Sequence, residues 1–474
     1  MRYLATVVIS MLSAVGLMAQ TAGGLDASFT KAREELDAIR QEFADSADAA
    51  LADYLDFEAR LLDEYEAFRN EVMQTWGDSV MVESSKKEWV EYSMDKSSRT
   101  SVNWESGKVS IEVLVDPSDD EDAVRQKLEK AVSDLISSRG STVGFESEVL
   151  PSKPLSDKPL LQGQLDLDKY GVTSEPVVAS SAPKPFGERK TNAPAPGRGG
   201  KLDLSRNRGA VTSALGSQTM ADKALEKRKE EELEAAKKAE EERVAQEVAV
   251  VEEKVAQSVA EVSAIVVAAE TPVVETVNTS EGTKNVVSIS MELVEDHLPK
   301  RAQQFKGMVS EHSATYSVDS PLVYAVMEQE SAFNPAAQSW VPAYGLMQLV
   351  PKSGGRDAYR YVHKVDQIPT PDFLLDPNNN IQLGTGYLKL LMSTSFAKVT
   401  DPQCRMLCAI AAYNTGAGNV SRAINGTTNI SKAIPTINTM SYDQLFEHLK
   451  VNLPHAETQD YIQKVTSKMQ KYIK

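Results

Sequence analysis

A long tract without apolar periodicity divides this chain and limits the folds that it can adopt. From Pro151 onward, and most clearly in SSAPKPFGERKTNAPAPGRGG, prolines, glycines and serines replace the regularly spaced apolar residues that precede them. Such a composition buries too little apolar surface to offset the conformational entropy lost on ordering. The chain of 474 residues is therefore expected to fold as separate domains on either side of this tract.

A charged segment lies inside the tract, at residues 221 to about 265, and is dense in alanine, glutamate and lysine. Opposite charges recur four residues apart, a spacing that supports a solvated helix or a semi-rigid spacer. A coiled coil is the alternative, although the apolar seam is thin. We expect residues 153–284 to be a linker, charged and disordered in large part, that contains this helical segment.

The residues before the linker have the pattern of a small α+β domain, at 24–152. Apolar residues recur at helical spacing over 26–69, which predicts a long helix or a helical hairpin. Alternating apolar residues then flank a turn at 105–108, as in a β-hairpin. An apolar helical repeat follows, opened by acidic residues and closed by Gly140. After the linker, the strand-like pattern at 285–300 is expected to return to the hairpin.

The first 19 residues have the pattern of a secretory signal. Arg2 precedes an apolar run that ends at Met18, shorter than the roughly 20 residues that a membrane-spanning helix needs. Ala19 offers a small residue for cleavage. An uncleaved anchor is the alternative, and no cysteine follows the run to accept a lipid. We therefore expect export to the periplasm, and association with the outer membrane or cell wall stays open.

Several kinds of chemistry have little support in the sequence. Cys404 and Cys408 share one face of an apolar helix, where a disulfide is sterically awkward, so we expect two core thiols. The five histidines lack zinc-site spacings and no G-x-S-x-G motif occurs. We expect no metal and no cofactor. The net charge of −17, without a basic stripe, argues against nucleic acid as a partner.

Glu330 is the candidate catalytic residue. Ser320 and Pro321 open a helix of about three turns in which Val323, Val326 and Glu330 share one face. A carboxyl group on an apolar face is partly desolvated, so its pKa should rise toward the roughly 6 to 7 that suits a general acid. The alternative is a glutamate that only satisfies a backbone group or reaches water at the helix end.

The segments around the candidate site lack other acids. Glycosidases with two catalytic carboxylates place them roughly 5–9.5 Å apart. Neither residues 331–356 nor residues 402–442 contain an aspartate or glutamate. Glu330 is therefore expected to work without a carboxylate partner, first as an acid and then as a base.

Several motifs carry a family resemblance. The stretches ESAFNP, GLMQL, AAYNTGAGNV and ETQDYIQKV occur in this order, with Ser339 between the first two. With them, residues 301–474 resemble the family 1 lytic transglycosylases, whose SLT domain has a helical fold like that of goose-type lysozyme. The stretch EWVEYSMDKSSRTSVNWESGKVSIEVLV resembles the amino-terminal domain of the murein transglycosylase C family. The linker and the missing lipid-accepting cysteine depart from that family.

The resemblance implies a reaction and a set of site residues. Glu330 would protonate the glycosidic oxygen between N-acetylmuramic acid and N-acetylglucosamine, then accept the proton of the muramyl C6 hydroxyl, leaving a 1,6-anhydro end. The same resemblance implies substrate-binding roles for Ser339, Met347, Gln348, Tyr413, Asn414 and Tyr461. Without the resemblance, Ser339 reads as a turn residue, Gln348 as a loop tie, and Met347, Tyr413 and Tyr461 as core.

The sequence thus predicts an α+β amino-terminal domain and a mainly α, lysozyme-like catalytic domain of the goose type. The expected function is cleavage of peptidoglycan glycan strands, with cell-envelope proteins as partners of the first domain. Two alternatives stay open. One is lysozyme-type hydrolysis, for which Asp357 or Asp376 would have to reach the site. The other is a glycan-binding scaffold without catalysis.

Overall fold

The computed structural model describes residues 49–77, 81–156, 158–166, 169, 262–266, 272–280, 282–339 and 342–473. Two compact units are present, one of Met1–Gly171 with Ile265–Lys474 and one of Val172–Ala264. The first unit contains every element discussed below. The expected signal peptide, the helical pattern before residue 49 and nearly all of the charged segment at 221–265 lie outside the described residues.

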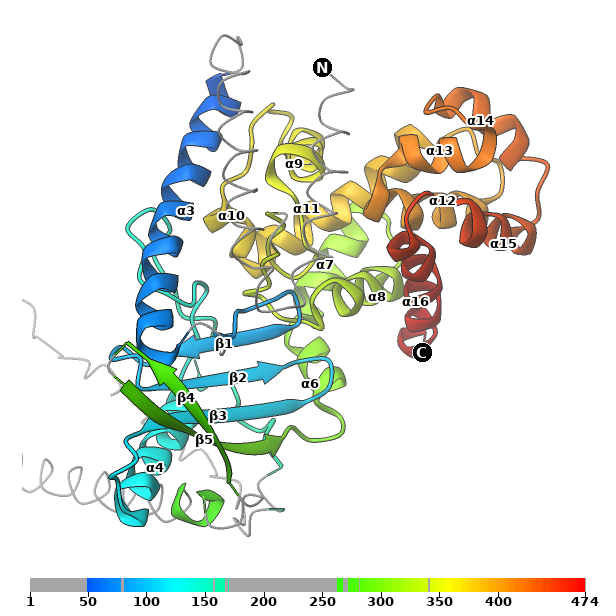
Figure 1. Cartoon of the computed structure of the whole chain (residues 1–474). Coiled ribbons are helices and arrows are strands. Elements are labelled where there is room, and N and C mark those ends of the chain that lie inside the picture. The colour runs from blue at the N-terminus through cyan, green and yellow to red at the C-terminus, as the bar shows by residue number, and fades with distance from the viewer. Residues whose placement is uncertain are drawn as a thin grey trace, which may run out of the picture. The chain divides into compact units, whose positions relative to one another are not determined.

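A five-stranded sheet forms the amino-terminal part of the first unit. It contains β1 (Glu88–Tyr92), β2 (Ser98–Asn103), β3 (Lys108–Val115), β4 (Val273–Thr279) and β5 (Gly282–Glu292). The strands lie in the order β1-β2-β3-β5-β4, and all neighbours are antiparallel (Figure 1). The predicted hairpin is confirmed, because Asn103 of β2 lies opposite Lys108 of β3. Val109 lies opposite Met291, so β5 returns to the hairpin from beyond the linker.

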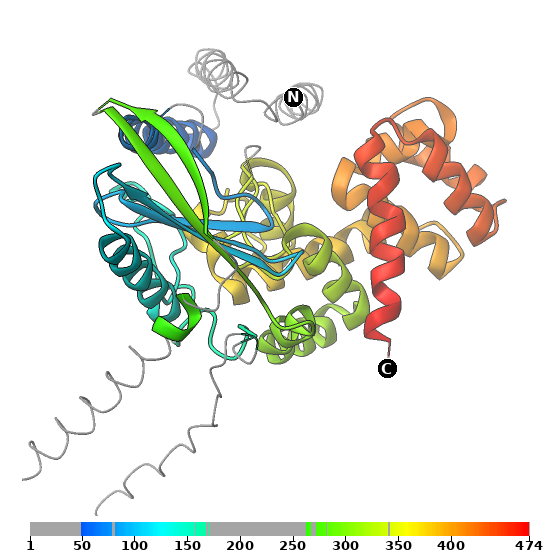
Figure 2. The ribbon, with the colours of Figure 1, turned by 60° about the horizontal axis from the view of Figure 1, so that its bottom comes forward.

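One helix covers each face of the sheet (Figure 2). Helix α3 (Ala49–Trp76) packs Val72 and Trp76 into a cluster with residues of β3, β4 and β5. Helix α4 (Glu121–Ser137) begins where the side chain of Asp120 accepts a hydrogen bond from the backbone of Ala123, as the acidic start of its sequence predicts. The sheet and these two helices form the α+β part of the fold.

The linker begins later and ends earlier than the sequence suggests. Leu165 forms an isolated bridge with Leu293, and Leu160 and Leu161 are buried. Strand β4 also falls inside the range assigned to the linker. Most of its residues are exposed, because it is an edge strand, so it lacks the apolar alternation that would reveal it. The short segment at 158–166 contributes too few apolar residues to show a period.

The rest of the first unit is helical. Its helices are α6 (His297–Gln304), α7 (Lys306–Tyr316), α8 (Ser320–Ser331), α9 (Arg356–His363), α10 (Pro371–Leu375), α11 (Pro377–Leu390), α12 (Pro402–Thr415), α13 (Ala417–Asn425), α14 (Ile430–Ile437), α15 (Tyr442–Asn452) and α16 (Ala456–Tyr472). Helix α8 packs against α7 and α16, and α12 also packs against α16. Cys404 and Cys408 of α12 are buried free thiols in this core, as predicted.

A tight loop between α8 and α9 is held by one buried side chain. Asn380 of α11 donates hydrogen bonds to the carbonyl oxygens of Tyr344 (2.8 Å) and Leu374 (2.7 Å) and accepts one from the backbone of Met347 (2.7 Å). Gly345 has φ +76°, and a Cβ atom there would lie 2.4 Å from the Leu374 carbonyl oxygen. Only glycine fits this position without moving the backbone.

Gly345→Ala should therefore lower the free energy of unfolding by more than about 2 kcal/mol, because it adds a backbone clash to the strain of a left-handed residue. Gly426→Ala is the matched control. Gly426 has φ +77° and nothing within 4 Å of an added Cβ, so it should cost only about 1 kcal/mol. Urea denaturation measures both changes, and equal effects would contradict the role given to the close contact.

Candidate active site

Glu330 lies in the last turn of α8, with 7% of its surface exposed. The apolar face of the helix is fully buried, so the carboxyl group is carried into the core as its spacing predicts. Two successive residues then take left-handed conformations, Ala332 at φ 49° and Phe333 at φ 61°. This sharp turn ends α8 directly after the carboxylate and sets the direction in which the chain leaves it.

The surroundings of Glu330 favour its protonated form. Burial raises the pKa of the carboxyl group above its ordinary value, and the negative charge of Glu457 adds to this effect. The positive charges of Lys86 and Lys87 and the Tyr461 hydroxyl act in the opposite direction, but burial outweighs them. A raised pKa favours the protonated carboxyl group, which is the form required of a general acid.

The charge of Glu330 acts on two nearby tyrosines. Burial and the nearby charge of Glu330 raise the pKa of Tyr413 and of Tyr461 well above the ordinary tyrosine value. The Tyr413 hydroxyl donates to the carbonyl oxygen of Met347 at 2.8 Å. The Tyr461 hydroxyl is buried and forms no hydrogen bond of regular geometry with the residues described here. The structure thus brings Glu330, Tyr413 and Tyr461 together, each from a different helix.

A second glutamate of α8 is buried too, but its charge is neutralised. Glu328 is 3% exposed, and its carboxylate oxygens accept hydrogen bonds from Lys471 (2.9 Å) and Tyr472 (2.7 Å), with Lys468 at 3.3 Å. Burial by itself would raise its pKa, yet these partners lower it below the ordinary value. The two glutamates of one helix therefore have pKa values shifted in opposite directions, and Glu330 is the one suited to proton transfer.

One acidic residue lies near Glu330, and the expectation that Glu330 works without a carboxylate partner stays a prediction. Glu457, near the start of α16, is exposed and close enough for its charge to raise the pKa of Glu330. Glu457 lies in α16, outside residues 331–356 and 402–442, the two segments that lack acidic residues. The two acids weighed for a hydrolase have other roles, because Asp357 pairs with Arg360 and Asp376 caps α11.

Met347 and Gln348, two loop residues predicted to bind substrate, are both buried, but only Gln348 has a polar atom without a partner among the described residues. Met347 is fully buried, and its sulfur packs against Gly384 of α11. This burial agrees with the alternative that Met347 is a core residue, and its expected contact with a sugar stays a prediction. Gln348 is 7% exposed and donates from Nε2 to the carbonyl oxygens of Ala337 (2.9 Å) and Gly345 (3.1 Å). Its Oε1 atom is buried without a partner among the described residues.

Asn414 is half-buried at the end of α12, and its side-chain oxygen accepts a hydrogen bond from the Thr458 hydroxyl at 2.7 Å. Thr458 belongs to α16, the helix that also carries Tyr461 and Glu457. This hydrogen bond ties the end of α12 to α16, and so fixes the two helices that supply Tyr413 and Tyr461. The geometry accounts for a supporting role of Asn414 beside the site.

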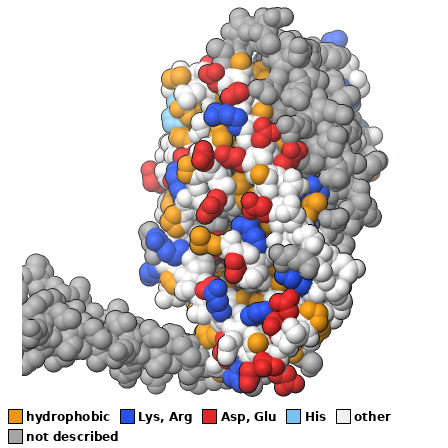
Figure 3. All heavy atoms as spheres, turned by 60° about the vertical axis from the view of Figure 1, so that its left-hand side comes forward, with side chains coloured by type: hydrophobic (Ala, Val, Ile, Leu, Met, Phe, Trp, Pro, Cys, Tyr) orange, Lys and Arg blue, Asp and Glu red, His pale blue; other side chains and the backbone are white. Residues whose placement is uncertain are grey.

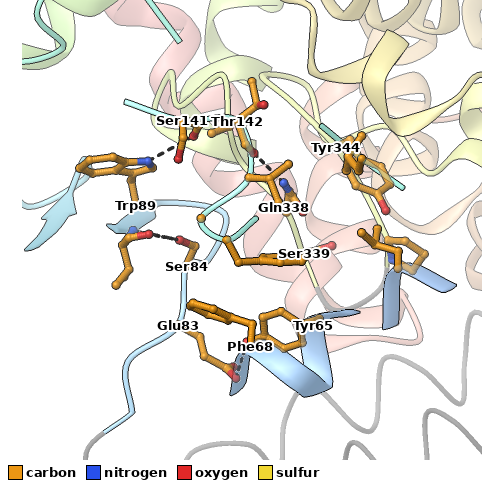
Figure 4. A pocket seen from close by; sticks show the side chains of 18 of the residues that line it. Tyr65, Phe68, Glu83, Ser84, Trp89, Ser141, Thr142, Gln338, Ser339 and Tyr344 are labelled. Carbon is orange, nitrogen blue, oxygen red and sulfur yellow. Dashed lines mark hydrogen bonds between the residues drawn. The ribbon is translucent and has the colours of Figure 1, made fainter. Parts of the chain in front are cut away.

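Ser339 is separated from this group in the structure. It lines a cavity of about 260 Å³ between the sheet domain and the loop that precedes α9, and Glu330 does not line that cavity. Tyr65, Phe68 and Trp89 form much of the wall, and Gln338 donates to the Thr142 carbonyl at 2.8 Å (Figure 4). Ser339 itself hydrogen-bonds across its turn to Ala343. Its placement beside Glu330 therefore stays a prediction.

The sheet domain contributes to the site, which the sequence did not reveal. The loop before β1 places Lys86 and Lys87 where their charges act on Glu330. Asn334, four residues after Glu330, donates to the Lys86 carbonyl at 3.5 Å. A contact between two segments so far apart in sequence has no local pattern.

Neither a metal site nor a membrane-spanning helix is found among the residues that the structure describes. The face of the molecule that carries α3 shows acidic and basic side chains interspersed, without a large patch of one sign (Figure 3).

The opposite environments of Glu328 and Glu330 predict opposite effects on stability. The pKa of Glu330 is raised on folding, so its carboxyl group costs stability as the pH rises above about 4.5. Glu330→Gln should thus be more stable than the wild type at pH 7 and equal to it in acid. The pKa of Glu328 is lowered, so its contribution is present at pH 7 and is lost as the pH falls.

Glu328→Gln should accordingly cost about 1–3 kcal/mol at pH 7 and progressively less in acid. Chemical denaturation of both variants between pH 4 and 7 measures this. Destabilisation of Glu330→Gln at pH 7 would contradict the account of its environment.

Comparisons with known proteins match both parts of the chain. Residues 307–434 match the family described as the transglycosylase SLT domain. Residues 56–177 match the N-terminal domain of membrane-bound lytic murein transglycosylase C. Membrane-bound lytic murein transglycosylase C of Sodalis glossinidius is 40% identical over 191 residues, which cover 40% of this chain and 53% of that protein. The corresponding protein of Klebsiella pneumoniae is 39% identical over 193 residues, 41% of this chain and 53% of that one.

Solved structures give partial overlays. An inactive mutant of the lytic transglycosylase Slt from Pseudomonas aeruginosa has a TM-score of 0.28 at 27% identity, over 35% of this chain and 23% of that one. The 70 kDa soluble lytic transglycosylase of Escherichia coli gives 0.27 at 22% identity, over 35% and 24%. The alignments span about half the length of the curated relatives. The resemblance to lytic transglycosylases is confirmed, and it extends to both the SLT domain and the amino-terminal domain of murein transglycosylase C.

Proposed function

We propose that this chain is a periplasmic lytic transglycosylase that cleaves the β-1,4 bond between N-acetylmuramic acid and N-acetylglucosamine in peptidoglycan. The observation that carries the proposal is the buried carboxyl group of Glu330, whose pKa is raised and which faces two tyrosine hydroxyls at the end of α8. The match of residues 307–434 to the SLT domain and the resemblance to murein transglycosylase C support the choice of substrate. The helical domain is proposed to be lysozyme-like, of the goose type.

In the first step Glu330 acts as a general acid. Its raised pKa favours the protonated carboxyl group, and the proton passes to the glycosidic oxygen as the bond to C1 breaks. Positive charge develops at C1 of the muramyl sugar. The substrate's own acetamido group is positioned to meet that charge, so the reaction requires no nucleophilic carboxylate from the protein.

In the second step the same residue acts as a base. The carboxylate of Glu330 takes the proton of the muramyl C6 hydroxyl, whose oxygen attacks C1 and closes the 1,6-anhydro ring. The proton given up in the first step is regained, and no water is consumed. Lys86 and Lys87 assist this step, because positive charges nearby stabilise the carboxylate between the two transfers.

Other side chains are proposed to hold the glycan. The unpartnered Oε1 of Gln348 is buried at the site loop and can accept a hydrogen bond from a sugar hydroxyl or amide. The buried hydroxyl of Tyr461 has no well-aligned hydrogen-bond partner among the described residues. Asn414 supports the neighbouring helix ends, and Ser339 is proposed to contact the acetamido region of the bound glycan. The sheet domain is proposed to contact cell-envelope proteins.

Digestion of purified sacculi, followed by mass analysis, tests the proposal. The wild type should release fragments that are lighter by one water than hydrolytic products. Glu330→Gln should lower the rate of release on the order of a hundredfold or more, because it removes the transferred proton. Glu328→Gln is the matched control on the same helix, and its rate should stay within about twofold of the wild type under conditions where both are folded.

The same digestion separates the two alternatives. Products that carry an added water would establish lysozyme-type hydrolysis. A wild type that binds sacculi but releases nothing would favour the scaffold.

Glu457→Gln tests whether Glu457 takes part in the chemistry or only acts through its charge. Removing that charge should lower the pKa of Glu330, so the alkaline limb of the pH–rate profile should move to lower pH. The product should still be the anhydro sugar, with the maximal rate reduced less than about tenfold. A loss as large as that of Glu330→Gln would instead identify Glu457 as a second catalytic carboxylate.

A further inference from the structure

Arg301 is a buried cation in the segment that joins the sheet domain to the helical domain. It lies on α6, is 1% exposed, and its guanidinium stacks over the ring of Trp104 with 3.6 Å between the group and the ring centroid. Trp104, itself fully buried, follows β2 in the sheet domain. Position 301 lies outside both family matches, which cover 56–177 and 307–434.

No carboxylate pairs with Arg301 among the described residues. Its Nη2 atom donates to the Phe333 carbonyl oxygen at 2.6 Å, and Nη1 donates weakly to the Gln164 side-chain oxygen at 3.4 Å. The Nε atom is buried without a partner in the part of the chain described. Burial lowers the pKa of the guanidinium to about 9. A charge buried at such a cost requires a compensating role, and the short bond to Phe333 is its main polar contact.

The Phe333 carbonyl belongs to the sharp turn that follows Glu330. Phe333 and Ala332 both have positive φ, a conformation that non-glycine residues keep only when their surroundings enforce it. Phe333 is fully buried. The Ser331 hydroxyl donates to the carbonyl oxygens of Met327 (3.0 Å) and Leu346 (2.8 Å), which ties the same turn to the site loop.

We propose that Arg301 is a positioning residue for Glu330. Its guanidinium stacks on Trp104 of the sheet domain and holds the Phe333 carbonyl through a hydrogen bond. This contact fixes the turn that ends α8. The fixed turn then keeps the Glu330 side chain in one orientation. The inference rests on the proposed function of Glu330. Under this proposal the sheet domain contributes to catalysis, because Trp104 supports Arg301 and Arg301 supports the turn after Glu330.

The kinetic consequence is specific. Without Arg301 the Phe333 carbonyl would be buried without its donor, and the strained turn would relax. Misplacement of a catalytic group by about 1 Å is enough to reduce a rate about a hundredfold. The groups that set the protonation of Glu330 are Lys86, Lys87, Glu457 and Tyr461, together with burial. Substitution of Arg301 should therefore lower kcat, while KM and the apparent pKa values of the pH–rate profile stay nearly unchanged.

Arg301→Met in the full chain tests the proposal, with a soluble peptidoglycan oligosaccharide as substrate. Methionine fills the space with an apolar side chain and removes only the donor and the charge. We expect kcat to fall about 10- to 100-fold, with KM within about twofold of the wild type. Arg301→Lys, which keeps a buried donor but not the flat stacking group, should give an intermediate kcat. Circular dichroism establishes the temperature at which each variant is fully folded.

Lys153→Met is the matched control, because Lys153 also joins the two domains through an ion pair with Asp372, and neither residue is among the groups that act on Glu330. Its kcat should equal that of the wild type. Trp104→Leu tests the same contact from the sheet domain, and it should also lower kcat while KM stays nearly unchanged. A folded Arg301→Met or Trp104→Leu protein with wild-type kcat would overturn the proposal. The proposal would also be overturned if Lys153→Met lowered kcat as much as Arg301→Met does. A wild type that forms no anhydro product would instead count against the proposed function.

Discussion

The carboxyl group of Glu330 has to remain in an almost water-free environment at the end of a helix, and much of the helical domain serves this requirement. Helices α8 and α12 are apolar over most of their length because they enclose it. Tyr413 and Tyr461 close the space around it with groups that stay neutral. Two lysines limit the rise of its pKa without forming an ion pair with it. The result is a carboxyl group that can exist in either protonation state at moderate cost.

This environment is completed by residues from both ends of the chain. The sheet domain supplies Lys86 and Lys87, and its Trp104 supports Arg301 behind the turn that follows α8. Helix α16, the last helix of the chain, supplies Tyr461 and Glu457 and neutralises Glu328 through Lys471. Removal of either end would therefore alter the electrostatics of Glu330, and removal of α16 would also expose the core that this helix forms with α8 and α12.

The sequence predicted those features that depend on local spacing. The hairpin around residues 105–108, the helix after Asp120 and the burial of Glu330 all follow from apolar periods that can be read directly. Edge strand β4 was missed because a mostly exposed strand has no such period. Glu457, Lys86 and Asn380 were missed as neighbours of the site because they reach it from distant segments. The substrate role of Met347 stays a prediction, since an apolar run does not reveal which of its members contacts a ligand.

Direct titration of Glu330 tests the central claim most closely. Selective carbon-13 labelling of glutamate carboxyl groups, with Glu330→Gln and Glu328→Gln used to assign two resonances, gives the pKa of each group in the folded protein by NMR. The account predicts that Glu330 titrates above the ordinary value of 4.5 and that Glu328 titrates below it. A Glu330 resonance that titrates at or below 4.5 would show that the carboxyl group is ionised in the free site, and it would contradict the role of Glu330 as the proton donor.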